Sequence, residues 1–464
     1  MDQVSRFVAT VAVATALLPA ATHATQADDV AALRAEIAEL KAQYAESVAA
    51  LESRIDQLES AAPAAATVAA EPPPPAPAAA PPRNSSAFNP AISAILTGTY
   101  ADLSEDPGDY HFAGFMPSGG EIGPGERSFN LGESEVTVTG SVDPYFTASL
   151  TAALSPENEI GVEEAFVRTT ALPAGFTMKG GRFFSGLGYL NEIHAHAWDF
   201  VDQPLAYQAF FGGQYAQDGV QVKWLAPTDL YLELGAETGN GSGFPGTRSG
   251  GNGLNGIALF AHAGGDLGDS IGWRAGISWL DMDAEDRTYD DLDSLGNPVV
   301  NAFTGSSQTW IADAVLKWTP TGDARRRLLK LQAEYMHRTE DGDLAFDVDG
   351  AALSDGYRSR QSGWYVQGVY QFMPRWRAGL RYDELDSGSP RIDLVGSGAL
   401  QAEDFPLLLP ASPSRLSAMV DWSLSEFSRL RAQYAWDDAR DAATDRQLLI
   451  QYIVAIGAHG AHKF

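Results

Sequence analysis

The chain has 464 residues, a formal net charge of −29, 46 glycines and no cysteine. This length allows two ordinary domains or one large β-barrel, the absence of cysteine excludes disulfides and thiolate metal sites, and the acidity disfavours nucleic-acid binding. After the N-terminus no run approaches the roughly 18 apolar residues that a membrane-spanning helix needs, whereas the alternating strands of a membrane barrel leave no such run.

The first predicted element is a signal peptide over residues 1–24. Arg6 supplies the positive charge, and the apolar run 7–18 (FVATVAVATALL) is too short for a stable membrane anchor. Small residues at 22–27 offer a cleavage site. We therefore expect export, with the mature protein in or beyond a bacterial periplasm. An ordinary N-terminal helix is the alternative.

A short coiled coil is predicted over residues 28–60. Apolar side chains recur there every seven residues, at Val30, Ile37, Tyr44, Leu51 and Leu58. Such a repeat keeps one seam facing a partner helix, so we expect this segment to oligomerise in the periplasm. A lone amphipathic helix on a surface is the alternative. Residues 61–87 follow as a Pro/Ala-rich linker, an extended spacer before the main domain.

Residues 88–464 alternate apolar and polar side chains in short segments, which is the period of β-strands. For example, Ala378 and Leu380 alternate with Arg377 and Arg381. The polar faces carry too many charges for a packed core, and Trp and Tyr cluster at the ends of the apolar faces. We therefore predict an all-β fold, a transmembrane antiparallel β-barrel of about 16 strands. A soluble β-sandwich is the alternative.

The predicted connections alternate in length. Short turns, such as 142–145 and 373–375, alternate with long loops, and outer-membrane barrels combine short periplasmic turns with long outer loops. An even strand number places both barrel ends in the periplasm, where the coiled coil is expected. The terminal Phe464 looks like the signal by which the barrel assembly machinery recognises such proteins.

The third outer loop, residues 184–217, is predicted to fold into the lumen as a constriction. It is too long for a turn, and it is rich in aromatic residues and glycine. It contains no Arg or Lys, which disfavours phosphate selectivity because that needs clustered basic donors. Its polar candidates for the constriction are Glu192, His194, His196, Asp199 and Asp202.

Basic residues on later strands are predicted to face the lumen opposite this loop, namely Arg274, Arg377, Arg381, Arg429 and Arg431. Opposed charges across a narrow wet gap would order water and slow apolar solutes, as in a sieve for small polar solutes. For each arginine the alternative is an ordinary ion pair within the wall, for example with Asp383 or Asp421.

The same loop suggests a metal site. In an extended segment the side chains of His194 and His196 project on the same side, so both imidazoles could hold one Zn²⁺ with Glu192 or Asp199 as a third ligand. Hydrogen bonds within the loop are the alternative role of these histidines. The acidic outer segments 281–293 and 341–349 could bind Ca²⁺ or Mg²⁺ that bridges lipopolysaccharide, or could simply be solvated. No cofactor is required.

Four motifs carry a resemblance to a known family. They begin at Leu154 (LSPENE), Leu190 (LNEIHAHAWDF), Ser362 (SGWYVQGVYQFMPRW) and Gly457 (GAHGAHKF). With the signal, the heptads and the linker, they resemble the phosphate-selective porin-like family and, more closely, its relatives labelled zinc-regulated TonB-dependent outer-membrane receptors. The resemblance covers residues 88–464 and implies an outer-membrane barrel.

No catalytic motif stands out, so we predict no enzymatic activity. We predict a passive channel for small polar solutes or ions in the bacterial outer membrane, surrounded by lipid and lipopolysaccharide. We expect a homotrimer held together by the barrel and the coiled coil. The alternative function is a closed-barrel receptor that binds zinc or another ligand.

Overall fold

The computed structural model describes residues 90–119, 122–155, 159–247, 252–320, 322–440 and 443–457. The predicted signal peptide, coiled coil and Pro/Ala-rich linker, together with Phe464, lie outside the described residues. No helix within the described ranges is long and apolar enough to cross a membrane.

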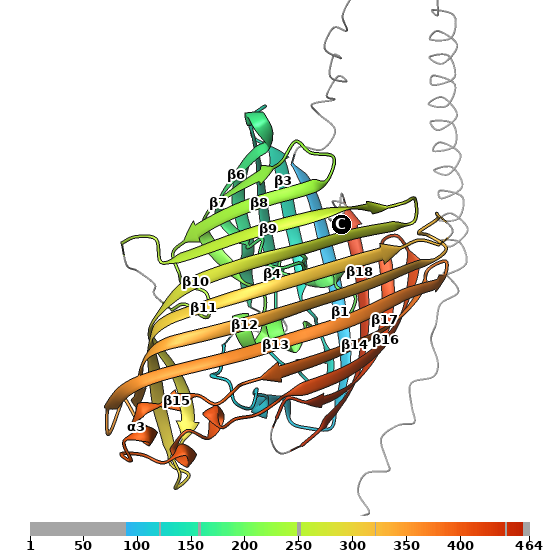
Figure 1. The fold of residues 1–464 in the computed structure, drawn as a ribbon. Helices are drawn as coiled ribbons and strands as arrows, with labels where there is room; N and C mark the ends of the chain where they lie inside the picture. Colours follow the sequence, from blue (N-terminus) through green and yellow to red (C-terminus); the bar gives the residue numbers. More distant parts are fainter. Residues whose placement is uncertain are drawn as a thin grey trace, which may run out of the picture. The chain divides into compact units, whose positions relative to one another are not determined.

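These residues form one antiparallel β-sheet that closes into a barrel (Figure 1). Of the eighteen strands in the described ranges, β2 (Ser128–Asn130) and β15 (Arg391–Ile392) are short additions, which leaves sixteen wall strands. β1 pairs with β3 on one side and with β18 on the other, so the sheet has no open edge. The predicted all-β barrel and its strand number are confirmed. The wall strands are β1 (Ala91–Leu103), β3 (Ser134–Ser141), β4 (Phe146–Leu154), β5 (Ile160–Thr169), β6 (Phe176–Phe184), β7 (Ala216–Leu225), β8 (Tyr231–Gly239), β9 (Gly256–Leu267), β10 (Ile271–Leu292), β11 (Pro298–Trp318), β12 (Leu328–Phe346), β13 (Leu353–Met373), β14 (Trp376–Asp386), β16 (Ser414–Ser425), β17 (Ser428–Asp438) and β18 (Asp445–Gly457).

Within the described ranges the helical elements are short and lie in the connections. They are η1 (Pro107–Asp109), η2 (Pro173–Gly175), η3 (Ala195–Ala197), α2 (Leu205–Phe211), α3 (Asp393–Gly396), η4 (Ala402–Asp404) and η5 (Pro406–Leu408).

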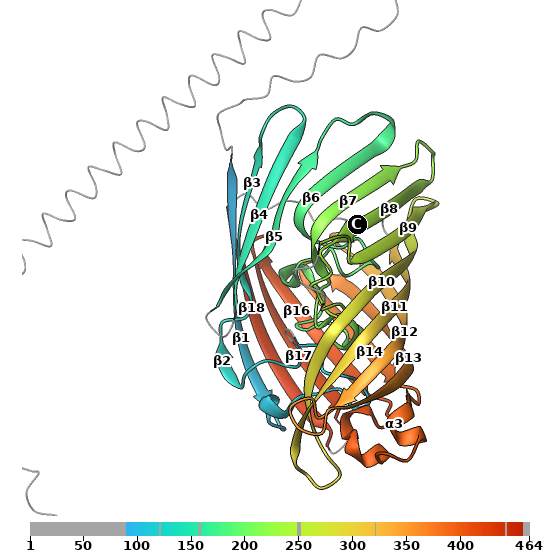
Figure 2. The ribbon, with the colours of Figure 1, turned by 90° about the vertical axis from the view of Figure 1, so that its left-hand side faces the viewer.

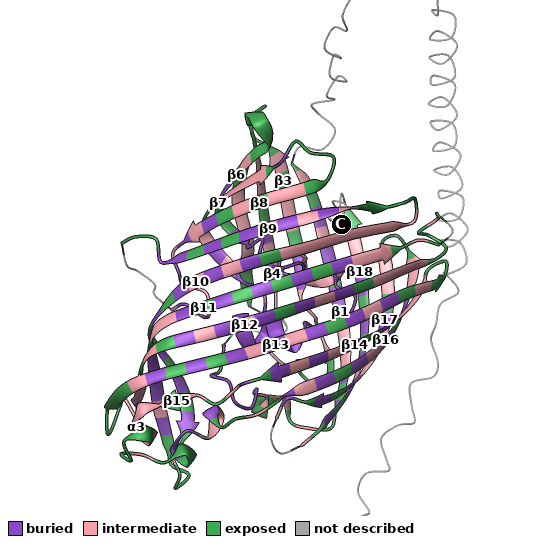
Figure 3. Ribbon diagram, viewed as in Figure 1, coloured by how far each residue is buried: buried purple, intermediate pink, exposed green. Residues whose placement is uncertain are grey.

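The barrel is apolar on its outer face and polar on its inner face. In β14, Leu380 is 62% exposed while the next residue, Arg381, is 1% exposed, because successive side chains of a strand point to opposite faces. Figure 3 shows this alternation along the wall strands. The inner face buries polar residues such as Thr97, Gln221, Ser278, Asp313, Gln332, Gln433 and Gln447. A soluble sandwich would bury its apolar face instead.

The two ends of the barrel differ. At one end short turns join the strands. The first residue of β1, Ala91, and the last residue of β18, Gly457, lie at this end. At the other end the connections after β1, β6, β8 and β14 are long and those after β4, β10 and β12 are short, while β10 to β13 reach 19 to 22 residues. The wall strands from β3 to β8 have only 8 to 10 residues. One side of the wall therefore extends much further than the other.

The acidic segments expected in outer loops are partly strand. Residues 281–292 belong to β10 and residues 341–346 to β12. These strands continue because their inner side chains pack against the connection between β14 and β16. This cluster contains Ala284, Tyr289, Phe303, Phe346, Tyr357, Leu394, Phe405 and Leu408. Asp293 and Asp347 lie in the turns, where their carboxylates accept hydrogen bonds from backbone N–H groups.

The connection between β6 and β7, residues 185–215, lies inside the barrel and is called the inward loop below (Figure 2). It contacts inner-face residues of β3, β8, β12 and β17, which are spread around the ring and which only a segment in the lumen can reach. Every residue of its helix α2 is buried. The loop packs with the connection after β1 and with β10 to β14 in an apolar cluster that includes Phe112, Phe115, Leu187, Leu205, Phe210, Leu280, Ile311, Met336, Tyr365 and Leu385.

Candidate functional site

The base of the inward loop is closed by Asn191. Its side-chain amide nitrogen donates to the carbonyl oxygens of Ser185 and Tyr215, each at 2.8 Å, and its oxygen accepts from the N–H of Tyr215 at 2.7 Å. Gly188, which precedes Asn191 in the chain, has a φ of +63°, and a side chain at this position would collide with the carboxylate of Glu334. The loop therefore leaves the wall in one defined direction.

Two buried carboxylates of the wall hold the first turn of this loop. Glu334 of β12 accepts from the backbone N–H groups of Tyr189 and Leu190, at 3.0 and 3.1 Å, and from the hydroxyl of Tyr207 at 2.9 Å. Glu237 of β8 accepts from the backbone N–H of Gly186 at 2.8 Å. These contacts satisfy buried N–H groups that no strand partner can reach.

On the side of β12 to β17, basic residues of the wall bind the loop's aspartates. Asp199 lies 2.9 Å from Nζ of Lys330 and 2.8 Å from a guanidinium nitrogen of Arg377. Burial alone would raise the pKa of Asp199, but Lys330 and Arg377 outweigh burial and hold that pKa well below its usual range.

Asp202 is held in the same way. It lies 2.7 Å from Arg381 and 2.9 Å from Arg415. Burial raises the pKa of Asp202, but Arg415 and Arg381 outweigh that effect and lower the pKa to about 2. The carboxylate is therefore ionised throughout the physiological range.

Two further arginines bind backbone carbonyls of the loop. Arg429 donates to the carbonyl of His196, and Arg431 donates to that of Trp198 at 2.6 Å. We call these six residues the basic clamp: Lys330, Arg377, Arg381, Arg415, Arg429 and Arg431. The clamp touches the loop directly. The narrow wet gap that the sequence suggested between the acidic loop and these arginines is therefore absent at the clamp, because direct pairing compensates their buried charges better than solvent in a tight space.

Arg274 lies outside the clamp. It pairs with Asp313 of β11 at 2.9 Å and donates to the carbonyl of Gly188 at 3.3 Å. It thus combines the predicted contact with the loop and the alternative wall ion pair.

The predicted histidines lie on the opposite side, against β3 and β5. Nδ1 of His194 lies 3.2 Å from Glu135 and 3.3 Å from Glu163, and its Nε2 lies 3.2 Å from Glu164. Nδ1 of His196 lies 2.8 Å from Glu135. We call these five residues the histidine–glutamate cluster. Burial alone would lower the pKa of His194, but the three carboxylates outweigh burial and raise that pKa to about 12.

A β-bulge explains why two successive glutamates reach one imidazole. Thr151 of β4 pairs with Glu164, while the next residue, Ala152, pairs with Val162, so Glu163 is the extra residue. Such a bulge re-aims a side chain that strict alternation would send to the outer face. The pair Glu163-Glu164 inside an alternating strand was the available sequence signal, but it does not identify the partner.

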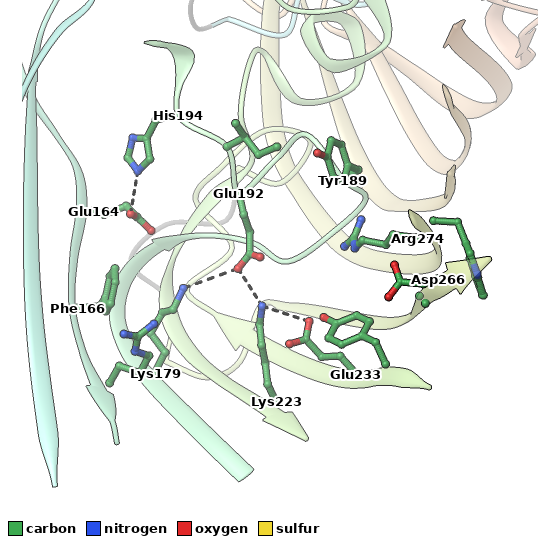
Figure 4. A pocket seen from close by; sticks show the side chains of 16 residues that line it. Glu164, Phe166, Lys179, Tyr189, Glu192, His194, Lys223, Glu233, Asp266 and Arg274 are labelled. Carbon is green, nitrogen blue, oxygen red and sulfur yellow. Dashed lines mark hydrogen bonds and ion pairs between the residues drawn. The ribbon is translucent and has the colours of Figure 1, made fainter. Parts of the chain in front are cut away.

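Glu192 does not join the histidines. Its carboxylate lies 3.0 Å from Nζ of Lys223 and 4.0 Å from Nζ of Lys179 (Figure 4). Within the described residues, the group whose ligand atoms approach within metal-binding range is instead Glu135, Glu163 and His194. Glu192 therefore pairs with lysines, and the carboxylates beside His194 come from the wall.

Two cavities flank the cluster. A cavity of about 660 Å³ at the short-turn end is lined by Glu164, Glu192 and His194 among others (Figure 4). A cavity of about 780 Å³ at the long-loop end is lined by Glu163 and His196, with residues of β1, β18 and the first connection. Neighbouring residues of β5 and of the loop thus face different cavities, and the cluster forms the partition between them.

No family model matches the chain, so the resemblance to the phosphate-selective porin-like family and its zinc-regulated relatives finds no support there. Among solved structures, a loop-deletion mutant of OmpT, an outer membrane protein of Vibrio cholerae, is 11% identical, covers 79% of this chain and 98% of its own, and has a TM-score of 0.48. The outer membrane channel DcaP of Acinetobacter baumannii is 11% identical, with coverages of 79% and 96% and a TM-score of 0.47. Likenesses this weak carry no information on function.

One curated relative is much closer in sequence. It is a protein of Aquifex aeolicus strain VF5 that is described only as uncharacterized. It is 30% identical over 407 residues, which cover 82% of this chain and 81% of the relative. The chain belongs to the same family as this Aquifex protein.

Proposed function

We propose that this protein is a porin-like channel of a bacterial outer membrane through which small polar solutes diffuse passively. The closed sheet with an apolar outer face supports this proposal, because a strand-built structure satisfies its backbone in lipid only when it is closed. Trp310, Trp318, Trp422 and Trp436 lie between 38% and 49% exposed, which fits the aromatic girdle of such barrels.

The two cavities support a path through the lumen. The inward loop is fastened to the wall from β10 to β17, by the apolar cluster and by the basic clamp. One cavity lies at the short-turn end against β5 to β10, and the other lies at the long-loop end against β1, β4, β5 and β18. The path we propose therefore runs off-centre, between the loop and this part of the wall, and its narrowest point is the histidine–glutamate cluster.

The lining suggests polar solutes with little net charge. In the cavity at the short-turn end Lys179 and Lys223 stand beside Glu192 and Glu233, and Phe166 adds an aromatic face. Both signs of charge are present and already paired, as in the contacts between Lys223 and the two glutamates. A solute crossing this space meets hydrogen-bonding groups without a strong field of one sign.

Single-channel conductance of the refolded mature protein in a planar bilayer tests this function. We expect small, steady openings, and openings in steps of three if the predicted homotrimer forms. Liposome-swelling rates with sugars of increasing size would then give the cut-off of the path. Folded protein without conductance or swelling would refute the channel and favour the closed-barrel receptor.

Location and assembly belong to the same proposal. We propose that export through the predicted signal peptide places the barrel in the outer membrane, with the coiled coil in the periplasm. Cell fractionation, and protease protection of residues 28–60 in intact cells, test this orientation.

A further inference from the structure

We propose that the histidine–glutamate cluster binds one divalent transition-metal ion of the Zn²⁺ type. Its ligands are Nδ1 of His194 and one carboxylate oxygen each from Glu135 and Glu163. This set differs from the His194, His196 and Glu192 set that the sequence suggested. A regulatory consequence follows, and that part rests on the channel function proposed above: a bound ion ties the inward loop to β3 and β5 and narrows the path.

The spacing of the three donors fits such an ion. Nδ1 of His194 lies 3.2 Å from Oε2 of Glu135 and 3.3 Å from Oε2 of Glu163, and all three donors lie within 4.8 Å of one another. Two ligands of a tetrahedral Zn²⁺ with bonds of 2.0–2.1 Å are separated by roughly 3.3 Å. An imidazole nitrogen among carboxylates also favours Zn²⁺-type ions over Ca²⁺ or Mg²⁺.

The groups behind these donors are already in place. The other ring nitrogen of His194, Nε2, lies 3.2 Å from Oε2 of Glu164. Nδ1 of His196 lies 2.8 Å from Oε1 of Glu135, the oxygen that is not offered to the ion. A metal-binding histidine usually donates its second N–H to a carboxylate, which fixes the ring and raises its basicity. Glu164 and His196 are thus positioned as supports for the ligands.

The contact between two of the donor atoms is an ion pair of 3.3 Å. Nδ1 of His194 and Oε2 of Glu163 are buried atoms without a hydrogen bond of good geometry. Three carboxylates meet only two imidazoles here, so a divalent cation would also balance the acidic excess. Because Glu163 borders one cavity and His194 the other, an ion can arrive from either end of the barrel.

Isothermal titration calorimetry of the full-length refolded protein with Zn²⁺ tests the site directly. We expect saturable binding of one ion per chain with a micromolar or tighter dissociation constant. Co²⁺ in place of Zn²⁺ should give the intense visible absorption of a tetrahedral site.

Three variants identify the ligands. His194→Ala and Glu163→Gln should each weaken Zn²⁺ binding at least tenfold, and Glu164→Gln should weaken it about tenfold through loss of the supporting contact. Glu192→Gln is the matched control, because it removes a nearby loop carboxylate that binds lysines, and its affinity for Zn²⁺ should equal that of the wild type. Glu163→Gln keeps the size of the side chain, so a folded variant is expected, and heat-modifiable migration on gels checks it.

The experiments distinguish failure of the metal site from failure of the proposed channel. Absence of a saturable site, or equal affinity in wild type and His194→Ala, would overturn the metal site while leaving the channel intact. Binding without any conductance, even in metal-free buffer, would refute the channel but retain the site. Zn²⁺ should block conductance in the wild type and in Glu192→Gln but not in Glu163→Gln, and this result would support both the metal site and its effect on the channel. Unchanged wild-type conductance at saturating Zn²⁺ would overturn the proposed narrowing of the path.

Discussion

The two flanks of the inward loop are fastened by opposite arrangements of charge. On the basic-clamp side the loop supplies carboxylates, Asp199 and Asp202, and the wall supplies cations. On the other side the loop supplies imidazoles, His194 and His196, and the wall supplies carboxylates. Arg381, Arg415 and Arg431 of the clamp are each 1% exposed, whereas the histidine–glutamate cluster borders two cavities.

This difference separates a permanent attachment from an exchangeable one. Arginine stays protonated under all ordinary conditions, and its fork matches a carboxylate, so a clamp built from arginine holds one geometry. Imidazole can give up its proton to a metal ion that binds the ring nitrogen. The chain thus fixes one flank of the loop and leaves the other responsive to what enters the lumen.

Of the substitutions in the two flanks, Asp202→Ala in the basic-clamp flank should lower the free energy of unfolding the most. It removes one of the two carboxylates that Arg381 and Arg415 share, the other being Asp383, and removing one partner of a buried ion pair costs about 3 kcal/mol. The free energy of unfolding, measured by urea titration in micelles, should fall by that amount, and conductance should rise as the loop loosens. Asp218→Ala is the matched control: its pair with Arg182 is 43% to 45% exposed and should contribute less than about 1 kcal/mol. Equal losses in the two variants would contradict a special role for the clamp.

Acid should weaken the clamp in a defined pH range. The pKa of Asp202 is lowered from 3.8 to about 2 in the folded protein, so its stabilisation is complete above the unfolded pKa and is lost as the pH falls through the folded pKa. A shift of this size corresponds to a decrease of about 2 kcal/mol. Urea titrations of wild type between pH 5 and pH 2, set against Asp202→Asn, isolate this contribution. Parallel curves for the two proteins would argue against it.

Glu334→Gln should loosen the first turn of the loop with a moderate effect. The carboxylate accepts from two backbone N–H groups and from the hydroxyls of Tyr207 and Tyr365, and an amide has only one accepting oxygen. Leaving buried donors unsatisfied costs about 1–3 kcal/mol. We expect faster limited proteolysis within residues 185–215, while cleavage elsewhere is unchanged. Wild-type cleavage rates in this variant would show that the carboxylate is dispensable.

His194→Lys should make the histidine–glutamate flank resemble the basic-clamp flank, because it places a permanent cation among the carboxylates. A permanent cation would keep the pairing with Glu135, Glu163 and Glu164, so the free energy of unfolding should change little. The ring nitrogen is gone, so the response of conductance to Zn²⁺ should disappear. Retention of that response would place the responsive group elsewhere in the lumen.

The sequence by itself determined the barrel wall. The alternation that puts Leu380 outside and Arg381 inside is a local property of each strand, so it predicts strands, faces and strand number without knowledge of neighbours. The same reasoning located the long segment between β6 and β7 and its charged residues. The prediction of an outer loop was wrong at residues 281–292. There the strand β10 continues because its side chains pack against Phe405 and Leu408, in a connection more than a hundred residues away.

Only the tertiary structure decided which charges meet. His194 and Glu135 are far apart in the chain, and their contact depends on how deep the loop descends and on the register of β3 against β4. The bulge that turns Glu163 inward arises from the pairing of two strands, and the attraction of Glu192 to Lys223 depends on the position of β7. Each of these distances is set by long-range packing, which no local pattern in one segment can report.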